Sequence, residues 1–473
     1  MKTSEFPADF VWGAGTAAYQ IEGGVAKHGR GLSVWDVFSR QPGKTKHGHT
    51  GDVACDHVHR FAEDVSIMKR IGLGAYRFSI SWPRVLPEGV GASSEPGLGF
   101  YDRLVDKLLA AGIEPWITLF HWDLPYELHK RGGWQNPDSP YWFAEYTRAV
   151  VDRLSDRVSN WLTINEPQVF IGLGYGKGEH APGLSLPFHE QIGIAHNVLL
   201  AHGMAARTIR ERSHTTPRVG WAPVGITAAP ATESPEDIEA ARRATFRADR
   251  PTIWSNSWFN DPVMLGRYPE DGLSAYGNAL PASWERDLTV IHQPLDFFGI
   301  NLYRCEVVRA TPGGQPERVP LRTGFAQTAF AWEITPEVLY WAPTFFHERY
   351  RLPVLITENG MSNVDYPDVD GAVRDPQRIA YTRRHLLQLR RAVGAGVPIM
   401  GYMHWSLMDN YEWAEGYAQR FGLVHVDFET QQRTLKDSAS WYARVIATRG
   451  RSLDEPPTAS AAPLDAPEPA TPR

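Results

Sequence analysis

The chain is poor in the features that staple small secreted domains, bind zinc or cross membranes. Its 473 residues include two cysteines, which exclude a disulfide framework, and no C-x-x-C pair suggests zinc. No run of about 18 apolar residues indicates a membrane span. The net charge is −6 with Lys and Arg scattered, so we expect no nucleic-acid partner. The first residues, "MKTSEFPADFVWGAG", lack the apolar segment of a signal peptide, which predicts a cytoplasmic protein without a membrane partner.

Aromatic residues, by contrast, are plentiful. The chain has 17 Trp and 18 Tyr, and several stand beside polar residues after strand-like segments, as in "FHWDLP" (120–125) and "HWSLMDNYEWAEGY" (404–417). Aromatic faces in such places can stack on a ligand. With 42% hydrophobic and 22% charged residues, the overall composition is typical of a globular protein with a large core.

Short apolar segments rich in β-branched and aromatic residues alternate with amphipathic segments along most of the chain. This alternation predicts parallel strands separated by helices. Eight such units without a dinucleotide-binding fingerprint favour an α/β fold, a single (β/α)8 TIM barrel over residues 1–449, rather than the alternative of an open doubly wound sheet. Residues 450–473 are rich in Pro, Ala and acids, and we expect a disordered tail there. The expected strands are 10–16, 75–81, 115–121, 161–167, 218–225, 297–303, 353–359 and 398–406, and the expected helices include 60–72, 101–112, 144–158 and 377–394.

Polar residues gather where these strands are expected to end. In (β/α)8 barrels the active site lies at the carboxyl ends of the strands, so the clustering predicts one polar cavity with aromatic walls. The strand starts carry apolar or small residues, which argues against a purely structural cause. The residues concerned are Arg77, His121, Trp122, Asn165, Glu166, Asn301, Tyr303, Glu358, Asn359, His404 and Trp405.

Two of these residues, Glu166 and Glu358, are carboxylates at the ends of apolar strands, where an unpaired charge is costly. Two acids facing one cavity suit glycoside hydrolysis, in which one protonates the leaving oxygen and the other attacks the anomeric carbon or activates water. Arg77 is the candidate cation that keeps one acid ionised. A separation of about 5 Å would give retention and about 6.5–9.5 Å inversion, so the residues alone leave both outcomes open.

The chain resembles glycoside hydrolase family 1, the β-glucosidase family, from about Phe6 to Tyr442. The resemblance implies a (β/α)8 barrel and a retaining double displacement, with Glu166 as general acid/base and Glu358 as nucleophile. It implies a small-molecule carbohydrate substrate, no cofactor and no metal, and it leaves the oligomeric state open. It rests on many motifs in order, among them "FVWGAGTAAYQIEG" (10–23), "YRFSISWPR" (76–84), "TLFHWDLP" (118–125), "TINEP" (163–167), "ITENG" (356–360) and "HWSLMDNYEWAEGY" (404–417).

The resemblance also implies roles for the residues around the acids. Tyr303 matches the tyrosine that contacts the nucleophile, and we expect Arg77 and Asn301 to support the acids. On the aglycone side we expect Gln168, Leu173 and Trp332; Gln168 stands where the family usually has Trp. The residues expected to bind the sugar are Gln20, His121, Trp122, Asn165, Trp405, Glu412, Trp413 and Phe421.

The expected activity is that of an exo-acting β-glucosidase on oligosaccharides or on aryl and alkyl glucosides, with β-galactosides and β-fucosides as further candidates. One alternative is a 6-phospho-β-glycosidase, which Glu412 disfavours because a carboxylate repels a phosphate, as does Gln419 at a position where Lys is common. A second alternative is a catalytically dead carbohydrate-binding barrel, which the intact acid pair disfavours. The "HVH" at 57–59 could resemble a metal-binding pair, but it opens an expected helix, so we expect no metal there.

Overall fold

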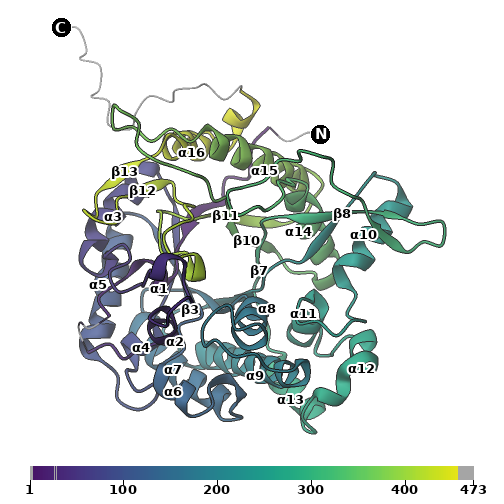
Figure 1. The fold of residues 1–473 in the computed structure, drawn as a ribbon, viewed down its shortest axis with the longest axis horizontal. Coiled ribbons are helices and arrows are strands. Elements are labelled where there is room, and N and C mark those ends of the chain that lie inside the picture. The colour runs from purple at the N-terminus through teal and green to yellow at the C-terminus, as the bar shows by residue number, and fades with distance from the viewer. Residues whose placement is uncertain (1–3, 26, 28, 456–473) are drawn as a thin grey trace.

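Eight parallel strands form a closed barrel with helices outside it (Figure 1). The computed structural model describes residues 4–25, 27 and 29–455. The strands follow one another in the order β5-β4-β3-β2-β1-β11-β10-β7, and a parallel bridge between Val224 and Asn301 joins the two ends. The (β/α)8 barrel is therefore confirmed, and the open sheet is wrong. The strands are β1 Val11–Gly15, β2 Ala75–Ser79, β3 Glu114–Phe120, β4 Asn160–Asn165, β5 Arg218–Ala222, β7 Phe298–Asn301, β10 Val354–Asn359 and β11 Ile399–Trp405.

The helices follow the strands as their apolar periodicity predicts. The four expected helices appear as α3 (His57–Ile71), α5 (Glu95–Ala110), α7 (Ser139–Leu154) and α15 (Pro376–Gly394). Ser94 caps α5 by accepting the Gly97 N–H, and α3 ends at Gly72 in a left-handed conformation that glycine adopts readily. Among the described residues, none of the helices has the length and apolarity needed to cross a bilayer. The other helices are α1 Ala18–Ile21, α2 Val34–Ser39, α4 Trp82–Val85, α6 Tyr126–Lys130, α8 Pro167–Val169, α9 Phe188–Arg212, α10 Pro235–Phe246, α11 Asn256–Leu265, α12 Glu270–Tyr276, α13 Trp284–Ile291, α14 Val338–Tyr350 and α16 Asp437–Ala447.

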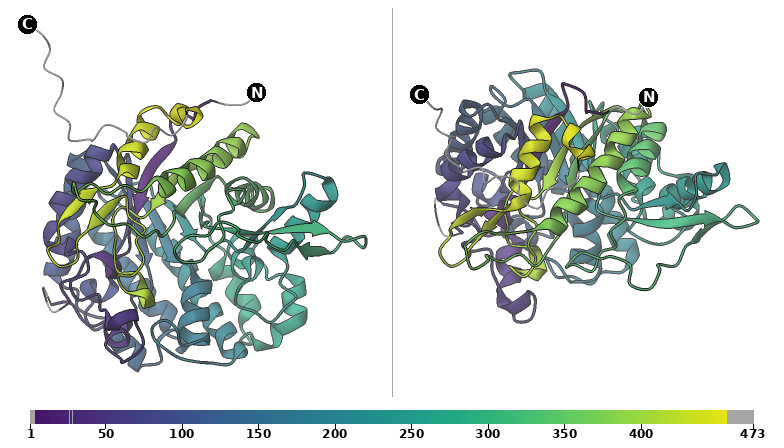
Figure 2. Two further views of the ribbon diagram at one scale, coloured as in Figure 1. Left: turned by 45° about the horizontal axis from the view of Figure 1, so that its top comes forward. Right: turned by 90° about the horizontal axis from the view of Figure 1, so that it is seen from above.

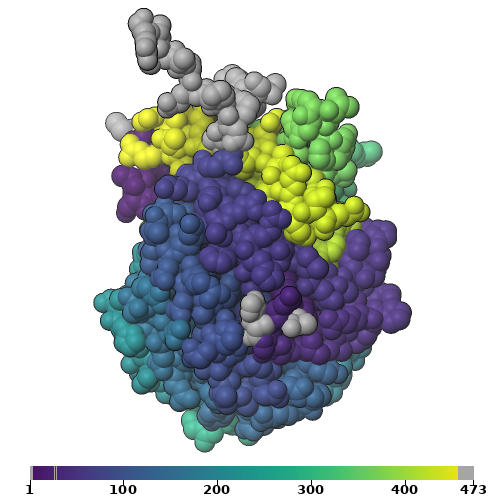
Figure 3. Space-filling view, turned by 90° about the vertical axis from the view of Figure 1, so that its left-hand side faces the viewer, coloured from purple at the N-terminus to yellow at the C-terminus, as the bar shows by residue number. Residues whose placement is uncertain are grey.

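Short segments add a second layer to the barrel. Strands β6 (Thr227–Pro230), β8 (Cys305–Ala310) and β9 (Pro316–Arg318) form a small separate sheet that extends away from the barrel (Figure 2). Strands β12 (Val424–Val426) and β13 (Arg433–Leu435) form a hairpin near the C-terminal end. The guanidinium of Arg433 donates to Asp64 of α3 at 3.0 Å, which ties this hairpin to the N-terminal third of the chain; Figure 3 shows the yellow and purple segments side by side.

The barrel interior is apolar at one level and polar at the next. A compact cluster of seven buried residues comes from six strands and from Phe297 just before β7: Ala75, Trp116, Leu162, Ala222, Phe297, Leu355 and Met403. Side chains two positions further along a strand point to the same face. Ala75 is thus followed by Arg77, Trp116 by Thr118 and Leu355 by Thr357. The change from apolar to polar along one face means that the polar strand ends lie on an apolar floor.

The C-terminal end differs from expectation where the structure describes it. Residues Arg451–Asp454 form a short 3-10 helix (η6) within the segment expected to be disordered, and Leu453 is fully buried. Asp454 accepts a hydrogen bond from Arg390 of α15 at 3.1 Å. The rest of the expected tail, 456–473, lies outside the described residues.

Candidate active site

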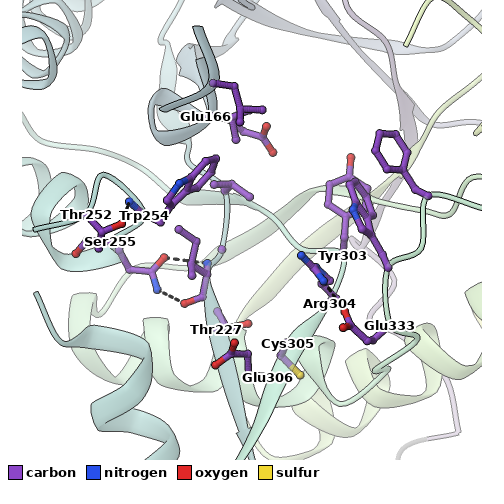
Figure 4. Close-up of a pocket in the computed structure, with 18 of the residues that line it drawn as sticks. Glu166, Thr227, Thr252, Trp254, Ser255, Tyr303, Arg304, Cys305, Glu306 and Glu333 are labelled. Atoms are coloured by element: carbon purple, nitrogen blue, oxygen red, sulfur yellow. Dashed lines mark hydrogen bonds and ion pairs between the residues drawn. The ribbon is translucent and has the colours of Figure 1, made fainter. Parts of the chain in front are cut away.

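A cavity of about 1380 Å³ opens where the barrel strands end. It exceeds the range of about 300–1,000 Å³ that is typical of small-molecule pockets, so it has room for more than one sugar ring. The small β6–β8–β9 sheet and the segment before α11 form its outer wall, and Figure 4 shows Thr227, Ser255 and Glu306 there, away from Glu166. Its inner wall contains His121, Trp122, Glu166, Tyr303, Glu358, Trp405, Glu412, Trp413 and Phe421.

Irregular strand ends place the two acids in this inner wall. The pairing of β10 with β7 shifts between Ile356 and Glu358, and the pairing of β4 with β5 shifts between Leu162 and Asn165. Such irregularities re-aim side chains that regular alternation would place on the other face. As a result the sequence neighbours Thr357 and Glu358 both reach the polar network inside the barrel, where Thr357 donates to Asn301 and Arg77 donates to Glu358.

Glu166 follows β4 in a left-handed backbone conformation, with φ of +43°. Its backbone N–H donates to the carbonyl of Ala222 on β5 at 2.8 Å, and α8 begins at the next residue, Pro167. A left-handed non-glycine residue carries strain and persists where its surroundings hold it. The turn therefore fixes the side chain of Glu166 at the rim of the barrel rather than in a strand or helix face.

An amide and guanidinium network behind the wall positions both acids. Asn301 Nδ2 donates to Glu166 Oε1 at 2.9 Å and to Asn165 Oδ1 at 3.0 Å. Arg77 donates to Asn165 Oδ1 at 2.6 Å and to Glu358 Oε1 at 2.7 Å. Tyr303 donates its hydroxyl to the second oxygen of Glu358 at 2.5 Å. Glu358 thus receives donors on both oxygens, including one cation, whereas Glu166 receives a neutral amide.

These different surroundings separate the protonation states of the acids. Burial raises the pKa of Glu166 to about 8, and the negative charge of Glu358 adds to the rise. Burial also raises the pKa of Glu358, but Arg77 and the Tyr303 hydroxyl oppose the rise by stabilising the carboxylate. At neutral pH the proton therefore resides on Glu166, and Glu358 is the ionised partner. One acid therefore holds a proton that it can donate, and the other carries a negative charge.

The end of the cavity near His121 and Gln20 has a donor and an acceptor left free. Asn165 Nδ2 donates to His121 Nε2 at 3.0 Å, which places the His121 proton on Nδ1. Burial, together with Arg77, holds the pKa of His121 well below its ordinary value, so the ring is neutral. Gln20 donates to Glu412 at 3.1 Å and to Asn410 at 3.0 Å. His121 Nδ1 and Gln20 Oε1 are buried without a partner among the described residues, as expected of groups that await ligand hydroxyls.

Aromatic rings surround this end. The rings of Trp122 and Trp413 lie 4.5 Å apart between centroids, and Trp405 stacks on His121 at 5.8 Å. Trp122 donates its indole N–H to the carbonyl of Asn165 at 3.0 Å, which fixes the ring beside Glu166. Burial raises the pKa of Glu412 to about 8, and the charge of Glu358 adds to the rise. Glu412 is therefore protonated at neutral pH and can donate as well as accept a hydrogen bond.

Most residues singled out from the sequence meet in this site, at two depths. Gln20, Arg77, Asn165 and Asn301 are buried behind the lining residues and hold them in place. Two strand-end residues point elsewhere: Asn359 donates to the Leu302 carbonyl at 2.7 Å, and His404 packs on Tyr442 at 5.7 Å between centroids. Of each pair of sequence neighbours, Glu358–Asn359 and His404–Trp405, only one residue lines the cavity: Glu358 in the first and Trp405 in the second.

Two of the three residues expected on the aglycone side line the cavity. Leu173 and Trp332 line the cavity, but Gln168 is fully buried outside its lining, and both of its amide atoms lack a partner among the described residues. The structure therefore places Gln168 in the core, outside the cavity in which it is expected. Successive residues of a helix point about 100° apart, so α8 turns Gln168 into the core and its neighbour Val169 toward the cavity.

The outer wall was not foreseen, because its residues lie between barrel strands rather than at their ends. Thr227, Trp254 and Asn256 come from the insertion after β5, while Arg304 and Glu333 come from the segment after β7 and form an ion pair with one another. The tryptophan-rich stretch "TIWSNSW" (252–258) was the available signal in the sequence. Thr357, whose hydroxyl donates to Asn301, was missed for a different reason. It reaches the polar network only because the register of β10 against β7 shifts.

A (β/α)8 barrel with two buried acids of opposite protonation in an aromatic-walled cavity defines a glycosidase. Comparisons with known proteins agree. The model for Glycosyl hydrolase family 1 matches residues 2–451. Beta-glucosidase A of Thermotoga maritima is 43% identical over 456 residues, which cover 95% of this chain and 99% of that protein. A bifunctional beta-D-glucosidase/beta-D-fucosidase of Bifidobacterium breve is 40% identical in an alignment of 476 positions, which covers 94% of this chain and 99% of that protein.

Solved structures give the same result. The beta-glucosidase from Thermotoga maritima in complex with glucoimidazole superposes with a TM-score of 0.86 at 42% identity, covering 95% of this chain and 100% of that chain. A complex of the same enzyme with deoxynojirimycin also superposes with a TM-score of 0.86. The chain therefore belongs to glycosyl hydrolase family 1, as its motifs predict, and it is an enzyme of that family.

Proposed function

We propose that the protein is a retaining, exo-acting β-glucosidase that releases terminal non-reducing β-D-glucosyl residues from oligosaccharides such as cellobiose or from aryl and alkyl glucosides. The single observation that carries this proposal is the contrast between the two acids. Glu358 has Arg77 and Tyr303 on its oxygens, whereas Glu166 is buried against a neutral amide and holds a proton. That contrast suits a nucleophile and a proton donor.

In the first step Glu358 attacks the anomeric carbon while Glu166 protonates the departing glycosidic oxygen, which leaves as an alcohol. The products of this step are an α-glucosyl ester on Glu358 and an ionised Glu166. Esterification removes the negative charge that helps to raise the pKa of Glu166. Glu166 then becomes a suitable base, takes a proton from water as it attacks the ester, and β-glucose leaves with its configuration retained.

Sugar specificity is assigned to the far end of the cavity. Gln20 and Glu412 form one hydrogen-bonded unit there, and His121 offers a free N–H. Amide, carboxyl and imidazole groups satisfy sugar hydroxyls, and the faces of Trp405 and Trp413 can cover the apolar face of a pyranose. A 6-phosphate would add negative charge beside Glu412 and Glu358, the same kind of charge effect that already raises the pKa of Glu412, and is therefore disfavoured. β-Fucosides are a second candidate substrate class, because the relative from Bifidobacterium breve is named for both activities.

Proton NMR of a fresh reaction with an aryl β-glucoside tests the proposal. β-Glucose should appear first and convert slowly to the anomeric mixture. α-Glucose as the first product would show inversion and remove Glu358 from the nucleophile role. Turnover of the 6-phosphorylated glucoside alone would support the phospho-glycosidase, and hydrolysis of neither substrate would support a binding protein. A cytoplasmic location stays a prediction.

A further inference from the structure

Trp254 lines the cavity in a way that the other tryptophans near the acids do not. It lies between α10 and α11, and Figure 4 shows its ring between Glu166 and Ser255. Among the described residues its ring has no aromatic partner and its indole N–H has no acceptor. Trp122, by comparison, packs on Trp413 and donates to Asn165. Trp254 therefore has stacking and hydrogen-bonding capacity that the protein itself does not use.

The position of this ring is set by the segment that follows Glu166. A Cβ atom on Gly172 would lie 3.0 Å from Cζ2 of Trp254 and 2.8 Å from Ile253, so the indole edge packs directly on the backbone there. Gly172 lies six positions after Glu166, in the π-helical segment Phe170–Gly176 that continues from α8. In the proposed reaction the leaving group takes the proton of Glu166, and Val169, Leu173 and Trp254 line the same cavity as that acid. Trp254 therefore lies on the side of the cavity next to the proton donor, as Figure 4 shows.

The wall across the cavity is also aromatic. Trp332 packs on Phe330 at 4.7 Å and on Tyr303 at 5.2 Å between centroids, and all three residues line the cavity. Figure 4 shows Tyr303 and Trp254 on opposite sides. A flat group between them would meet an apolar face on each side, and an oxygen substituent could accept the free indole N–H.

From this geometry we infer that Trp254 is a specificity-determining residue that binds the aglycone and favours flat aromatic aglycones of two fused rings. Gln168, which the sequence suggests for the aglycone side, is buried outside the cavity lining and does not contact a ligand there. The inference rests on the proposed function, because it requires a leaving group next to Glu166. It assigns to the insertion between β5 and β7 a part in substrate choice.

Two substrates separate this role from the chemistry: 4-methylumbelliferyl β-glucoside, which has a two-ring aglycone, and β-glucosyl fluoride, which has none. In Trp254→Ala, kcat/KM for the two-ring glucoside should fall about tenfold, as expected for one lost stacking contact with its hydrogen bond, while kcat/KM for the fluoride stays unchanged. Trp254→Phe should restore most of the loss. Trp284→Ala, which removes a tryptophan outside the cavity, should leave the ratio of the two substrates unchanged.

An equal loss on both substrates in Trp254→Ala would mean a structural role and would overturn the inference, as would no loss on either. A wild-type protein that hydrolyses neither substrate would overturn the proposed function and this inference with it. Hydrolysis of both by the wild type with an unaltered ratio in Trp254→Ala would overturn the inference alone.

Discussion

Removing the hydroxyl of Tyr303 should make the nucleophile harder to ionise. In the structure this hydroxyl donates to Glu358 at 2.5 Å, and together with Arg77 it stabilises the charged carboxylate in its buried place. A hydrogen bond to a charged group contributes about 1.5–3 kcal/mol. In Tyr303→Phe the pKa of Glu358 therefore rises, and a smaller fraction of the enzyme carries an ionised nucleophile at low pH.

The direction of the pKa change at Glu358 determines how the loss of activity depends on pH. A donor to the ionised form lowers a carboxyl pKa, so its loss moves the acid limb of the kcat/KM profile to higher pH. On the acid side kcat/KM should fall about 10- to 100-fold, from the same free energy, and the loss should shrink as the pH rises. The basic limb, which follows the proton on Glu166, should move little. The measurement is a kcat/KM profile from pH 4 to pH 9 on one aryl glucoside.

Tyr442→Phe provides the matched control. Tyr442 is fully buried and donates its hydroxyl to the Gly13 carbonyl at 3.0 Å, without contact to either acid. It should lose about 1 kcal/mol of stability and keep the acid limb in place. An unmoved acid limb in Tyr303→Phe, or a pH-independent loss, would show that Tyr303 does not stabilise the charge of Glu358.

Three further changes test the remaining assignments. Glu358→Ala should abolish turnover, and azide should restore it with an α-glucosyl azide as product; a β-azide would exchange the roles of the acids. Glu166→Ala should retain the first step for glycosides with activated leaving groups and lose it for alkyl glucosides, whereas equal losses would count against Glu166 as the acid. Glu412→Gln tests the raised pKa of about 8: between about pH 5 and pH 8 the folded protein holds a proton that the unfolded chain has already released, so stability falls as the pH rises across that window. The variant should flatten this fall in denaturant unfolding measured at both ends of the window; an unchanged slope would mean that Glu412 is ionised in the native state.

The sequence by itself determined the barrel and the place of its site. Short apolar runs rich in β-branched and aromatic residues and amphipathic segments are local properties of the chain, and each of the eight expected strands appears in the barrel within a few residues of its expected bounds. Polar residues after those strands indicated one end of the barrel, because parallel strands end together. The family motifs then indicated the acids Glu166 and Glu358.

Only the tertiary structure decided which neighbouring side chains enter the site. Regular alternation would place Thr357 and Glu358 on opposite faces, yet a register shift between β10 and β7 brings both to the same network. The left-handed turn at Glu166 sends Gln168 into the core and Val169 to the cavity. Trp254 reaches the cavity from the insertion between β5 and β7, so a search limited to the ends of the barrel strands does not find it. These outcomes depend on pairing between distant strands and on packing, whereas the periodicity of a sequence reports only what each segment buries.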